Sequence, residues 1–177
     1  MSDVRHVVLC GTAGSGKSTV GLLAAKALRR RFVDVDRLVE HEAGMPVRAI
    51  FERLGEPAFR ARERAAVARV LASPEPLVVA LGGGSLENDA TLADVKAHTL
   101  VWLDAPVWAL ASRVLAGDDR PLLAGDPVAR LRELAAAREP RYRQAHLTVD
   151  ATDSPRRVAV ALVAALRNGR YLIGGRG

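Results

Sequence analysis

Short apolar runs alternate along the chain with longer stretches of helical periodicity. The apolar runs cover residues 6–10, 32–35, 77–81, 99–103 and 147–150. Strands of a parallel sheet are apolar on both faces because helices cover both sides of the sheet, and strands that alternate with helices are typical of this arrangement. The pattern predicts an α/β fold: a three-layer α/β/α sandwich with a central parallel five-stranded sheet.

The segments between the apolar runs have the spacing of helices. A helix is expected over 17–30, with an inner face made of Val20, Leu23, Ala24, Ala27 and Leu28. Helices are also expected from 36 to 73, with breaks at the turn residues 44–46 and 55–57. A polar stretch with Gly, Asp and Pro, about 115–127, interrupts the later helices. Such a stretch beside a nucleotide site is a candidate lid.

Length and composition indicate one domain over residues 1–177 that can bury a core of its own. A single cysteine, Cys10, excludes an intrachain disulfide and suits a reducing compartment. The longest apolar stretch, 158–166, is far shorter than the roughly 20 residues of a membrane span. No signal peptide is visible at the start of the chain, so we expect a cytoplasmic protein with no membrane association.

The formal net charge of +6 raises the question of nucleic acid. The chain contains no helix-turn-helix pattern, no zinc-finger spacing and, with aromatics at 4%, no stacking platform. Several arginines instead have spacings that let them converge on phosphates or a carboxylate. We therefore expect no nucleic-acid partner. We also expect a monomer, because no long exposed apolar face is evident.

A phosphate-binding loop follows the first predicted strand. Residues 11–18 read GTAGSGKS and satisfy the pattern GxxxxGK[ST], between an apolar strand and a helix. The glycines let backbone N–H groups turn toward phosphate oxygens at the start of the helix. Lys17 is expected to reach the β- and γ-phosphates, and Ser18 to bind magnesium. The candidate nucleotide-binding residues here are Gly14, Ser15, Gly16, Lys17, Ser18 and Thr19.

Two aspartates, Asp34 and Asp36, follow the second predicted strand in the sequence FVDVD. Ligands of an open parallel sheet bind beyond the carboxyl ends of its strands, where the phosphate-binding loop also lies. With a period of two residues, both side chains point to the same side. One could support hydrated magnesium while the other accepts a hydrogen bond from a substrate hydroxyl. The alternative is that Asp36 simply caps the next helix.

A second group of polar residues lies in the pattern FxxxGExxFRxxE, which ends at Glu63. Arg60 and Glu63 are three residues apart on a predicted helix, so the carboxylate can hold the guanidinium in position. A fixed arginine is a bidentate receptor for a carboxylate. The alternative is an ordinary solvated ion pair.

The ordered set of motifs resembles that of the shikimate kinases. The resemblance runs over most of the chain through GTAGSGKST, FVDVD, AGM, FERLGEPAFRARE, LGGGS, VWLDAP, DRPLL and REPRY. It implies a P-loop kinase fold with an acceptor-binding helical segment over about 36–64. It also implies ATP-dependent phosphorylation of the 3-hydroxyl of shikimate, giving shikimate 3-phosphate and ADP, with Mg²⁺ as cofactor. The reaction would belong to chorismate and aromatic amino-acid biosynthesis.

The resemblance implies roles on the acceptor side. Asp36 binds the shikimate hydroxyls and is the candidate to accept the proton of the attacking one. Arg60 and Arg138 clamp the shikimate carboxylate. The glycine run brings backbone against the substrate, and it consists of Gly82, Gly83 and Gly84. Ser85, which follows this run, replaces the small apolar residue that the family usually carries.

The resemblance also implies roles on the nucleotide side. Asp34 assists magnesium through water, since no acidic residue ends the third predicted strand. Arg120, in DRPLL, lies on the lid and closes over the transferring phosphoryl group, so that Lys17, magnesium and Arg120 together supply positive charge to an anionic transition state. Arg113 is similar to a position that stacks on adenine. The alternative for Arg113 is an exposed helix residue.

Other functions remain open from the sequence. The phosphate-binding loop alone does not separate shikimate from another small hydroxy acid such as gluconate, although Arg60, the glycine run and REPRY favour a cyclic carboxylate. A nucleoside monophosphate kinase lacks support because no base-reading pattern is present. A regulatory nucleotide-binding module would not need Asp36, Arg120 and Arg138. The four histidines lack metal-ligand spacing, and Trp102 and Trp108 are both expected to pack in the core.

Overall fold

The computed structural model describes residues 5–116 and 126–168 of the chain. A five-stranded parallel sheet forms its centre, with the strand order β2-β3-β1-β4-β5. The strands are β1 (Val7–Cys10), β2 (Arg31–Asp34), β3 (Leu77–Ala80), β4 (Thr99–Asp104) and β5 (Leu147–Asp150). The five predicted strands are confirmed, each within one residue at either end.

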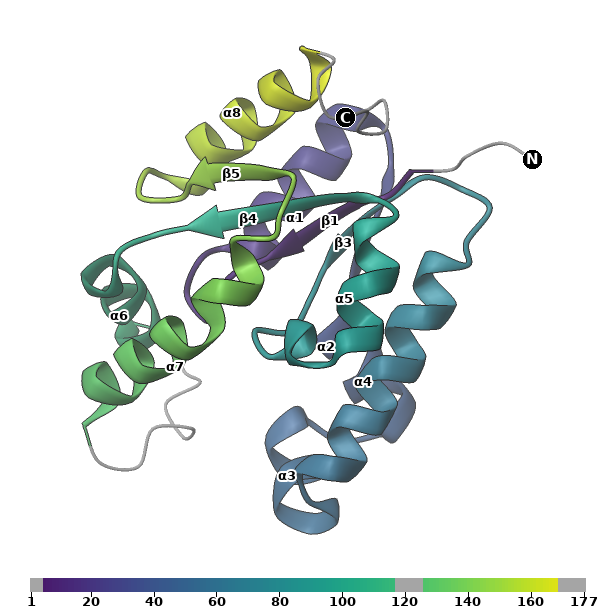
Figure 1. Cartoon of the computed structure of the whole chain (residues 1–177), viewed down its shortest axis with the longest axis vertical. Coiled ribbons are helices and arrows are strands. Elements are labelled where there is room, and N and C mark those ends of the chain that lie inside the picture. The colour runs from purple at the N-terminus through teal and green to yellow at the C-terminus, as the bar shows by residue number, and fades with distance from the viewer. Residues whose placement is uncertain (1–4, 117–125, 169–177) are drawn as a thin grey trace.

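Helices cover both faces of this sheet, so the predicted three layers are confirmed (Figure 1). They are α1 (Lys17–Leu28), α2 (Val35–Ala43), α3 (Val47–Leu54), α4 (Glu56–Leu71), α5 (Asp89–Lys96), α6 (Val107–Ala116), α7 (Pro127–Tyr142) and α8 (Pro155–Arg167), with the 3-10 helix η1 (Ser85–Glu87). Helices α1 and α8 pack on one face, whereas α2, α4 and α5 pack on the other. Helices α6 and α7 pack on each other through a small cluster of their own.

Strand β1 shows how the sequence produces the two-sided core. All four of its residues are buried. Val8 and Cys10 belong to the cluster under α4 and α5, whereas Val7 and Leu9 belong to the cluster under α1 and α8. Successive side chains of a strand point to opposite faces, so a central strand between two helical layers must be apolar at every position.

Helix α1 lies against the sheet through a different face from the one expected. Leu23 is 37% exposed and Ala27 is exposed, so the prediction was wrong for these two positions. The buried residues are Val20, Gly21, Ala24 and Ala25. A side chain at Gly21 would place its Cβ 2.5 Å from the ring of Phe32. The helix therefore approaches the sheet through its smallest residues, and the larger leucine is left outside.

The expected acceptor-binding segment, 36–64, corresponds to α2, α3 and the first half of α4. The two predicted breaks occur at Gly44 and Gly55, which have positive φ values of 65° and 82°. Helix α5 was not predicted. Of the expected lid, 115–127, only its two ends are described, because residues 117–125 lie outside the described part of the chain.

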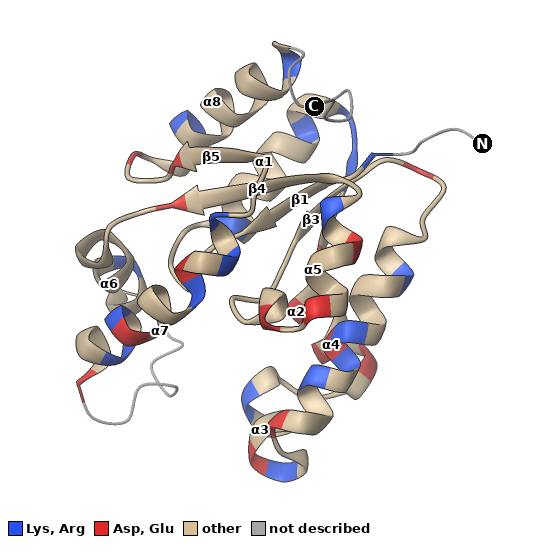
Figure 2. Ribbon diagram, viewed as in Figure 1, with Lys and Arg blue, Asp and Glu red and all other residues tan. Residues whose placement is uncertain are grey.

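Charged side chains of both signs are mixed over the helices, as blue and red segments show along α3, α4 and α7 (Figure 2). Many arginines pair with carboxylates, for example Arg48 with Glu52 on α3 and Arg64 with Asp94. Exposed pairs of this kind contribute little to stability. Within the described ranges, 5–116 and 126–168, no helix is long and apolar enough to cross a membrane.

Candidate active site

The strand order brings three segments to one edge of the sheet. Strand β3 lies between β1 and β2. The phosphate-binding loop follows β1, Asp34 ends β2, and the glycine run 82–84 follows β3. The carboxyl ends of parallel strands are where ligands of such sheets bind. The glycine run therefore lies between the two segments that the sequence assigned to nucleotide and metal.

The phosphate-binding loop turns sharply into α1. Gly16 forms the N-cap of α1 in the left-handed conformation, and Lys17 is the first residue of the helix. Gly14 also has a positive φ of 81°, and a Cβ there would lie 2.7 Å from the carbonyl oxygen of Leu110. Glycine is thus required both by the backbone conformation and by the close passage of α6.

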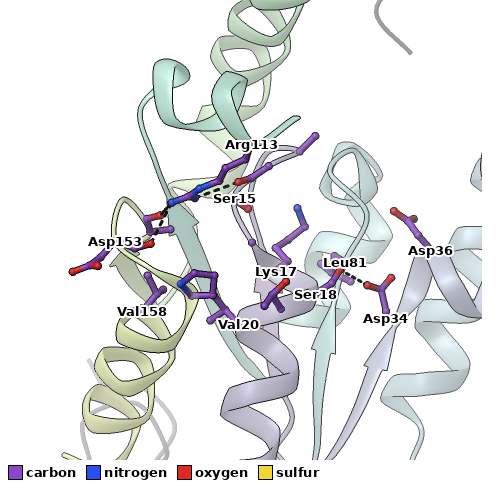
Figure 3. A pocket seen from close by; sticks show the side chains of 16 residues that line it. Ser15, Lys17, Ser18, Val20, Asp34, Asp36, Leu81, Arg113, Asp153 and Val158 are labelled. Atoms are coloured by element: carbon purple, nitrogen blue, oxygen red, sulfur yellow. Dashed lines mark hydrogen bonds between the residues drawn. The ribbon is translucent and has the colours of Figure 1, made fainter. Parts of the chain in front are cut away.

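Lys17 lies over the loop that it follows. Its Nζ donates to the carbonyl oxygens of Gly11, at 2.7 Å, and Thr12, at 3.1 Å. Burial lowers the pKa of Lys17, and the nearby Asp36 carboxylate opposes this effect. Lys17 lies between Arg113 on one side and Asp34 and Asp36 on the other (Figure 3).

A cavity of about 510 Å³ opens over the loop. The predicted nucleotide-binding and metal-binding residues that line it are Gly14, Ser15, Gly16, Lys17, Ser18, Thr19, Asp34 and Arg113, and Asp36 lines it as well. Its far wall is formed by Ala151, Asp153, Pro155 and Val158, from the β5–α8 connection and α8. These residues belong to no motif, so this far wall was not predicted.

Arg113, on α6, forms part of this cavity through backbone contacts. Its Nη1 donates to the carbonyl oxygen of Gly14, at 3.3 Å. Its Nη2 donates to the carbonyl oxygens of Ala151, Thr152 and Asp153, at 2.8, 3.0 and 3.2 Å. The alternative of an unattached exposed helix residue is therefore wrong. Arg113 joins the phosphate-binding loop to the β5–α8 connection, and its contact with adenine stays a prediction.

Ser18 and Asp34 adjoin each other at the floor of the cavity. The Ser18 hydroxyl donates to Asp34 Oδ2 at 2.5 Å, and Asp34 Oδ1 accepts from the Arg37 amide at 3.3 Å. Asp34, and not Asp36, is thus the N-cap of α2. Hydroxyl and carboxylate oxygens are ligands that Mg²⁺ takes, often with several waters retained. Ser18 and Asp34 together fit such an ion.

Asp36 lies in the first turn of α2, two residues beyond the end of β2. We expected Asp34 and Asp36 to point to the same side of an extended strand, and this was wrong for Asp36, which is helical. Both side chains nevertheless line the cavity. Asp36 Oδ1 is buried and has no hydrogen-bond partner among the residues that the structure describes. Burial, followed by the carboxylates of Glu63 and Asp34, raises the pKa of Asp36 to about 6. A buried acceptor without a partner that faces a cavity is suited to a ligand hydroxyl.

Two carboxylates meet at Gly82. A Cβ on this glycine would lie 2.4 Å from Glu63 Oε1 and 2.7 Å from Asp36 Oδ1. Glu63 is 3% exposed, and its Oε1 accepts a hydrogen bond of 2.5 Å from the Ser85 hydroxyl. Ser85 therefore gives a buried carboxylate one of its partners.

Two guanidinium groups approach the next two glycines. Arg60 Nη1 donates to Glu63 Oε2 at 2.8 Å, which confirms the predicted pair. A Cβ on Gly84 would lie 2.5 Å from Nη2 of Arg60 and 2.8 Å from its Nη1. A Cβ on Gly83 would lie 3.4 Å from Nη1 of Arg138. The glycine run thus has carboxylates at its first position and guanidinium groups at the next two.

Comparison with known proteins agrees with this geometry. A family model described as shikimate kinase matches residues 13–167. The chain belongs to the shikimate kinase family. It is 48% identical over 166 residues to a shikimate kinase of Caulobacter vibrioides, covering 92% of this chain and 82% of that protein. It is 44% identical over 165 residues to a shikimate kinase of Thermobifida fusca, covering 93% and 95%.

Solved structures of shikimate kinases share the fold. A shikimate kinase from Acinetobacter baumannii in complex with shikimate has a TM-score of 0.88 and 32% identity, covering 94% of this chain and 95% of that one. A gluconokinase from Sinorhizobium meliloti has a TM-score of 0.62 and 23% identity, covering 97% and 98%. This second likeness shows the fold alone, because P-loop kinases with different acceptors share it.

One predicted member of the shikimate kinase site cannot be placed, since Arg120 lies outside the described residues. Two others were missed. Glu87 accepts a hydrogen bond from Arg138, and the Tyr142 hydroxyl donates to the Gly83 carbonyl oxygen at 2.6 Å. Tyr142 ends the motif REPRY, which was the available signal for it. Glu87 belongs to no motif, and its partner is 51 residues away.

Proposed function

We propose that the chain transfers the γ-phosphoryl group of ATP to the 3-hydroxyl of shikimate, giving shikimate 3-phosphate and ADP. The observation that carries this proposal is the position of Asp36. Its unpartnered carboxylate oxygen is buried between the phosphate-binding cavity and a glycine run flanked by two arginines. A hydroxyl of a bound carboxylic acid could there face both a proton acceptor and the nucleotide. Membership of the family supports the choice of acceptor.

The nucleotide half of the site supplies positive charge and alignment. Backbone N–H groups of the loop, the start of α1 and Lys17 would hold the phosphates. Ser18 and Asp34 would hold Mg²⁺, which neutralises charge on the phosphates when bound. We propose that Arg120 adds a further positive charge near the transferring group, and that Arg113 borders the base.

The acceptor half binds and orients the second substrate. Arg60 and Arg138 would bind the shikimate carboxylate, because a guanidinium group matches a carboxylate in geometry and charge. Asp36 would accept the hydrogen bond of the attacking hydroxyl. The hydroxyl oxygen then forms the bond to the γ-phosphorus while the bond from that phosphorus to ADP breaks, and the proton of the hydroxyl passes to the Asp36 carboxylate. Catalysis of such a transfer consists mainly of positioning and charge stabilisation.

We further propose that the enzyme acts as a monomer in the cytoplasm, in aromatic amino-acid biosynthesis, without a nucleic-acid partner. The large apolar side chains that are exposed in the described residues are spread over several helices, with Leu22 on α1, Leu54 on α3, Trp108 on α6 and Val160 on α8. Isolated apolar residues of this kind are usual on a protein surface.

Phosphorus NMR of a mixture of the protein, MgATP and shikimate tests the proposed reaction. We expect the γ-phosphate signal of ATP to decay as one phosphomonoester signal and the ADP signals grow. The mixture without shikimate should retain its ATP. Retention of ATP in the presence of shikimate, with ATP binding intact, would remove the proposed acceptor and leave only the nucleotide half of the site.

A further inference from the structure

The side chain of Arg138 is attached to the protein at one end. Its Nε donates to Glu87 Oε1 at 2.5 Å. Arg138 is the more enclosed partner, with 15% of its side chain exposed, whereas 49% of the Glu87 side chain is exposed. Glu87 is the last residue of η1, the short helix that directly follows the glycine run. The contact therefore links α7 to the segment that forms the acceptor side.

The other end of the same guanidinium group faces the glycine run. Arginine has five N–H donors, of which one is on Nε and four are on the two Nη atoms. Glu87 takes the Nε donor, and Nη1 lies next to Gly83, 3.4 Å from a Cβ built there. The two Nη atoms are the pair that can bind a carboxylate end-on.

Arg60 is also held by a carboxylate. Its Nε and its Nη2 both donate to Glu56 Oε1, at 3.2 and 3.1 Å, and both of its Nη atoms lie next to Gly84. Two arginines on different helices thus direct their Nη ends at neighbouring glycines, and each is held through Nε by a carboxylate. Arg60 has a second acidic partner in Glu63, whereas Glu87 is the acidic partner found for Arg138 in the described residues.

We propose that Glu87 is a positioning residue of the acceptor site, which aims the Nη end of Arg138 at the carboxylate of the acceptor. This inference rests on the proposed function. A free arginine side chain loses rotamer entropy when it is fixed. When a carboxylate already holds Nε, the side chain is partly fixed before the substrate arrives, so less entropy is lost on binding.

Two other contacts make the role of Glu87 separable from the docking of α7. Arg141, one turn further along α7, pairs with Asp89 at the start of α5. The Tyr142 hydroxyl binds the Gly83 carbonyl oxygen. Neither contact involves Glu87. Loss of Glu87 should therefore release the Arg138 guanidinium while α7 stays against the glycine run.

Steady-state kinetics of Glu87→Ala and Glu87→Gln test the proposal, with Asp89→Asn as the matched control on the neighbouring ion pair. For Glu87→Ala we expect the KM for shikimate to rise about fivefold, in line with the loss of a partly exposed ion pair. The KM for MgATP and the Tm should not change. Glu87→Gln should keep the KM for shikimate close to that of the wild type, because its amide oxygen still accepts from Nε. Asp89→Asn should leave both KM values as they are.

A double-mutant cycle shows whether Glu87 acts through Arg138. Lysine has no Nε–H for Glu87 to hold, so in an Arg138→Lys background Glu87→Ala should change the shikimate KM less than about twofold. A full fivefold effect in that background would overturn the proposal. So would an unchanged or lowered shikimate KM in Glu87→Ala, or equal losses for both substrates. If the wild-type protein fails to phosphorylate shikimate, the proposed function fails together with this inference; if only the Glu87 variants disagree, the inference alone fails.

Discussion

Gly82 has no side chain at the place where two carboxylates approach the same point. A Cβ there would lie 2.4 Å from Glu63 Oε1 and 2.7 Å from Asp36 Oδ1. Real Cβ atoms do not come so close to other heavy atoms, so any larger residue would have to displace both groups. Glu63 is held by Arg60 and Ser85, whereas Asp36 Oδ1 has no hydrogen-bond partner among the described residues. Asp36 is therefore the group that would move further.

We predict that Gly82→Ala lowers kcat with shikimate about 100-fold, because a displacement of about 1 Å at a reacting group can cost that much. Gly83→Ala is the comparison. The nearest atom to its Cβ would be Arg138 Nη1, at 3.4 Å, so no carboxylate is displaced. Its kcat should fall less than about tenfold. Equal losses in the two variants would contradict the explanation through Asp36.

For individual residues, the sequence predicts which residues belong to the site better than it predicts their contacts. Arg60 with Glu63 is local in sequence, and helical spacing was enough to find it. The contact of Glu63 with Ser85 joins residues 22 positions apart, and no periodicity reports it. The helix cap was placed on Asp36 as an alternative to catalysis, but β2 ends one residue earlier than expected and Asp34 takes that role.

Helix α6 shapes the nucleotide cavity through one side chain. Arg113 donates to a carbonyl oxygen of the phosphate-binding loop and to three carbonyl oxygens of the β5–α8 connection. These two segments are far apart in sequence, and each forms a wall of the cavity. Hydrogen bonds from a charged group are worth about 1.5–3 kcal/mol. The distance between the walls should thus depend on this arginine.

We predict that Arg113→Ala raises the KM for MgATP about tenfold or more and leaves the KM for shikimate within about twofold, since no acceptor-side residue contacts Arg113 in the described structure. Arg130→Ala is the control, because Arg130 forms an exposed i,i+3 pair on α7. Kinetics of both variants with each substrate varied in turn provide the measurement. A rise in the shikimate KM alone would contradict the assignment of Arg113 to the nucleotide half.

The elements that the sequence predicts best are those whose hydrophobic pattern fits only one position in the fold. A continuous apolar run between turns fits a central strand, and all five strands were found. The orientation of α1 was not predicted, because alanine, glycine and leucine all satisfy an apolar pattern. Only the close packing against Phe32 selects the small residues. Trp102 packs against the core as expected, but the expectation for Trp108 was wrong, because it is 68% exposed on α6.

Some contacts that stabilise the fold lie at the opposite end of the sheet from the candidate active site. At the end of the strands opposite the site, His6 is fully buried before β1. Its Nδ1 accepts from the Leu77 amide at 3.1 Å, and its Nε2 contacts the Leu71 carbonyl oxygen at 3.1 Å. The amide requires an unprotonated Nδ1, so the proton of the neutral ring is on Nε2. His6 in this form joins β1 to β3 and to the end of α4.

We predict that the wild-type protein loses stability as the pH falls through the ordinary histidine pKa of 6.5. Burial lowers the pKa of His6, and the charge of Arg30 lowers it further. The unfolded chain therefore binds the proton more readily, and acid favours unfolding. His6→Leu should lose about 1–3 kcal/mol at pH 7.5 for each backbone group left unpaired, and its stability should depend less on pH.

Urea unfolding at several pH values measures this difference. His41→Leu is the control, because His41 lies on the exposed side of α2. Groups that titrate elsewhere are the same in both variants, so the difference in pH dependence reports His6. A pH dependence of His6→Leu equal to that of the control would contradict the prediction.

The central claim is that one buried carboxylate, Asp36, connects a nucleotide site to a site for a cyclic hydroxy acid. The measurement that tests it most directly is ADP release from MgATP with shikimate, with gluconate or without an acceptor, for the wild-type protein and for Asp36→Asn. We predict rapid release with shikimate alone and a loss of about 100-fold or more in Asp36→Asn. Equal release with gluconate, or an Asp36→Asn variant with normal turnover on shikimate, would contradict the account.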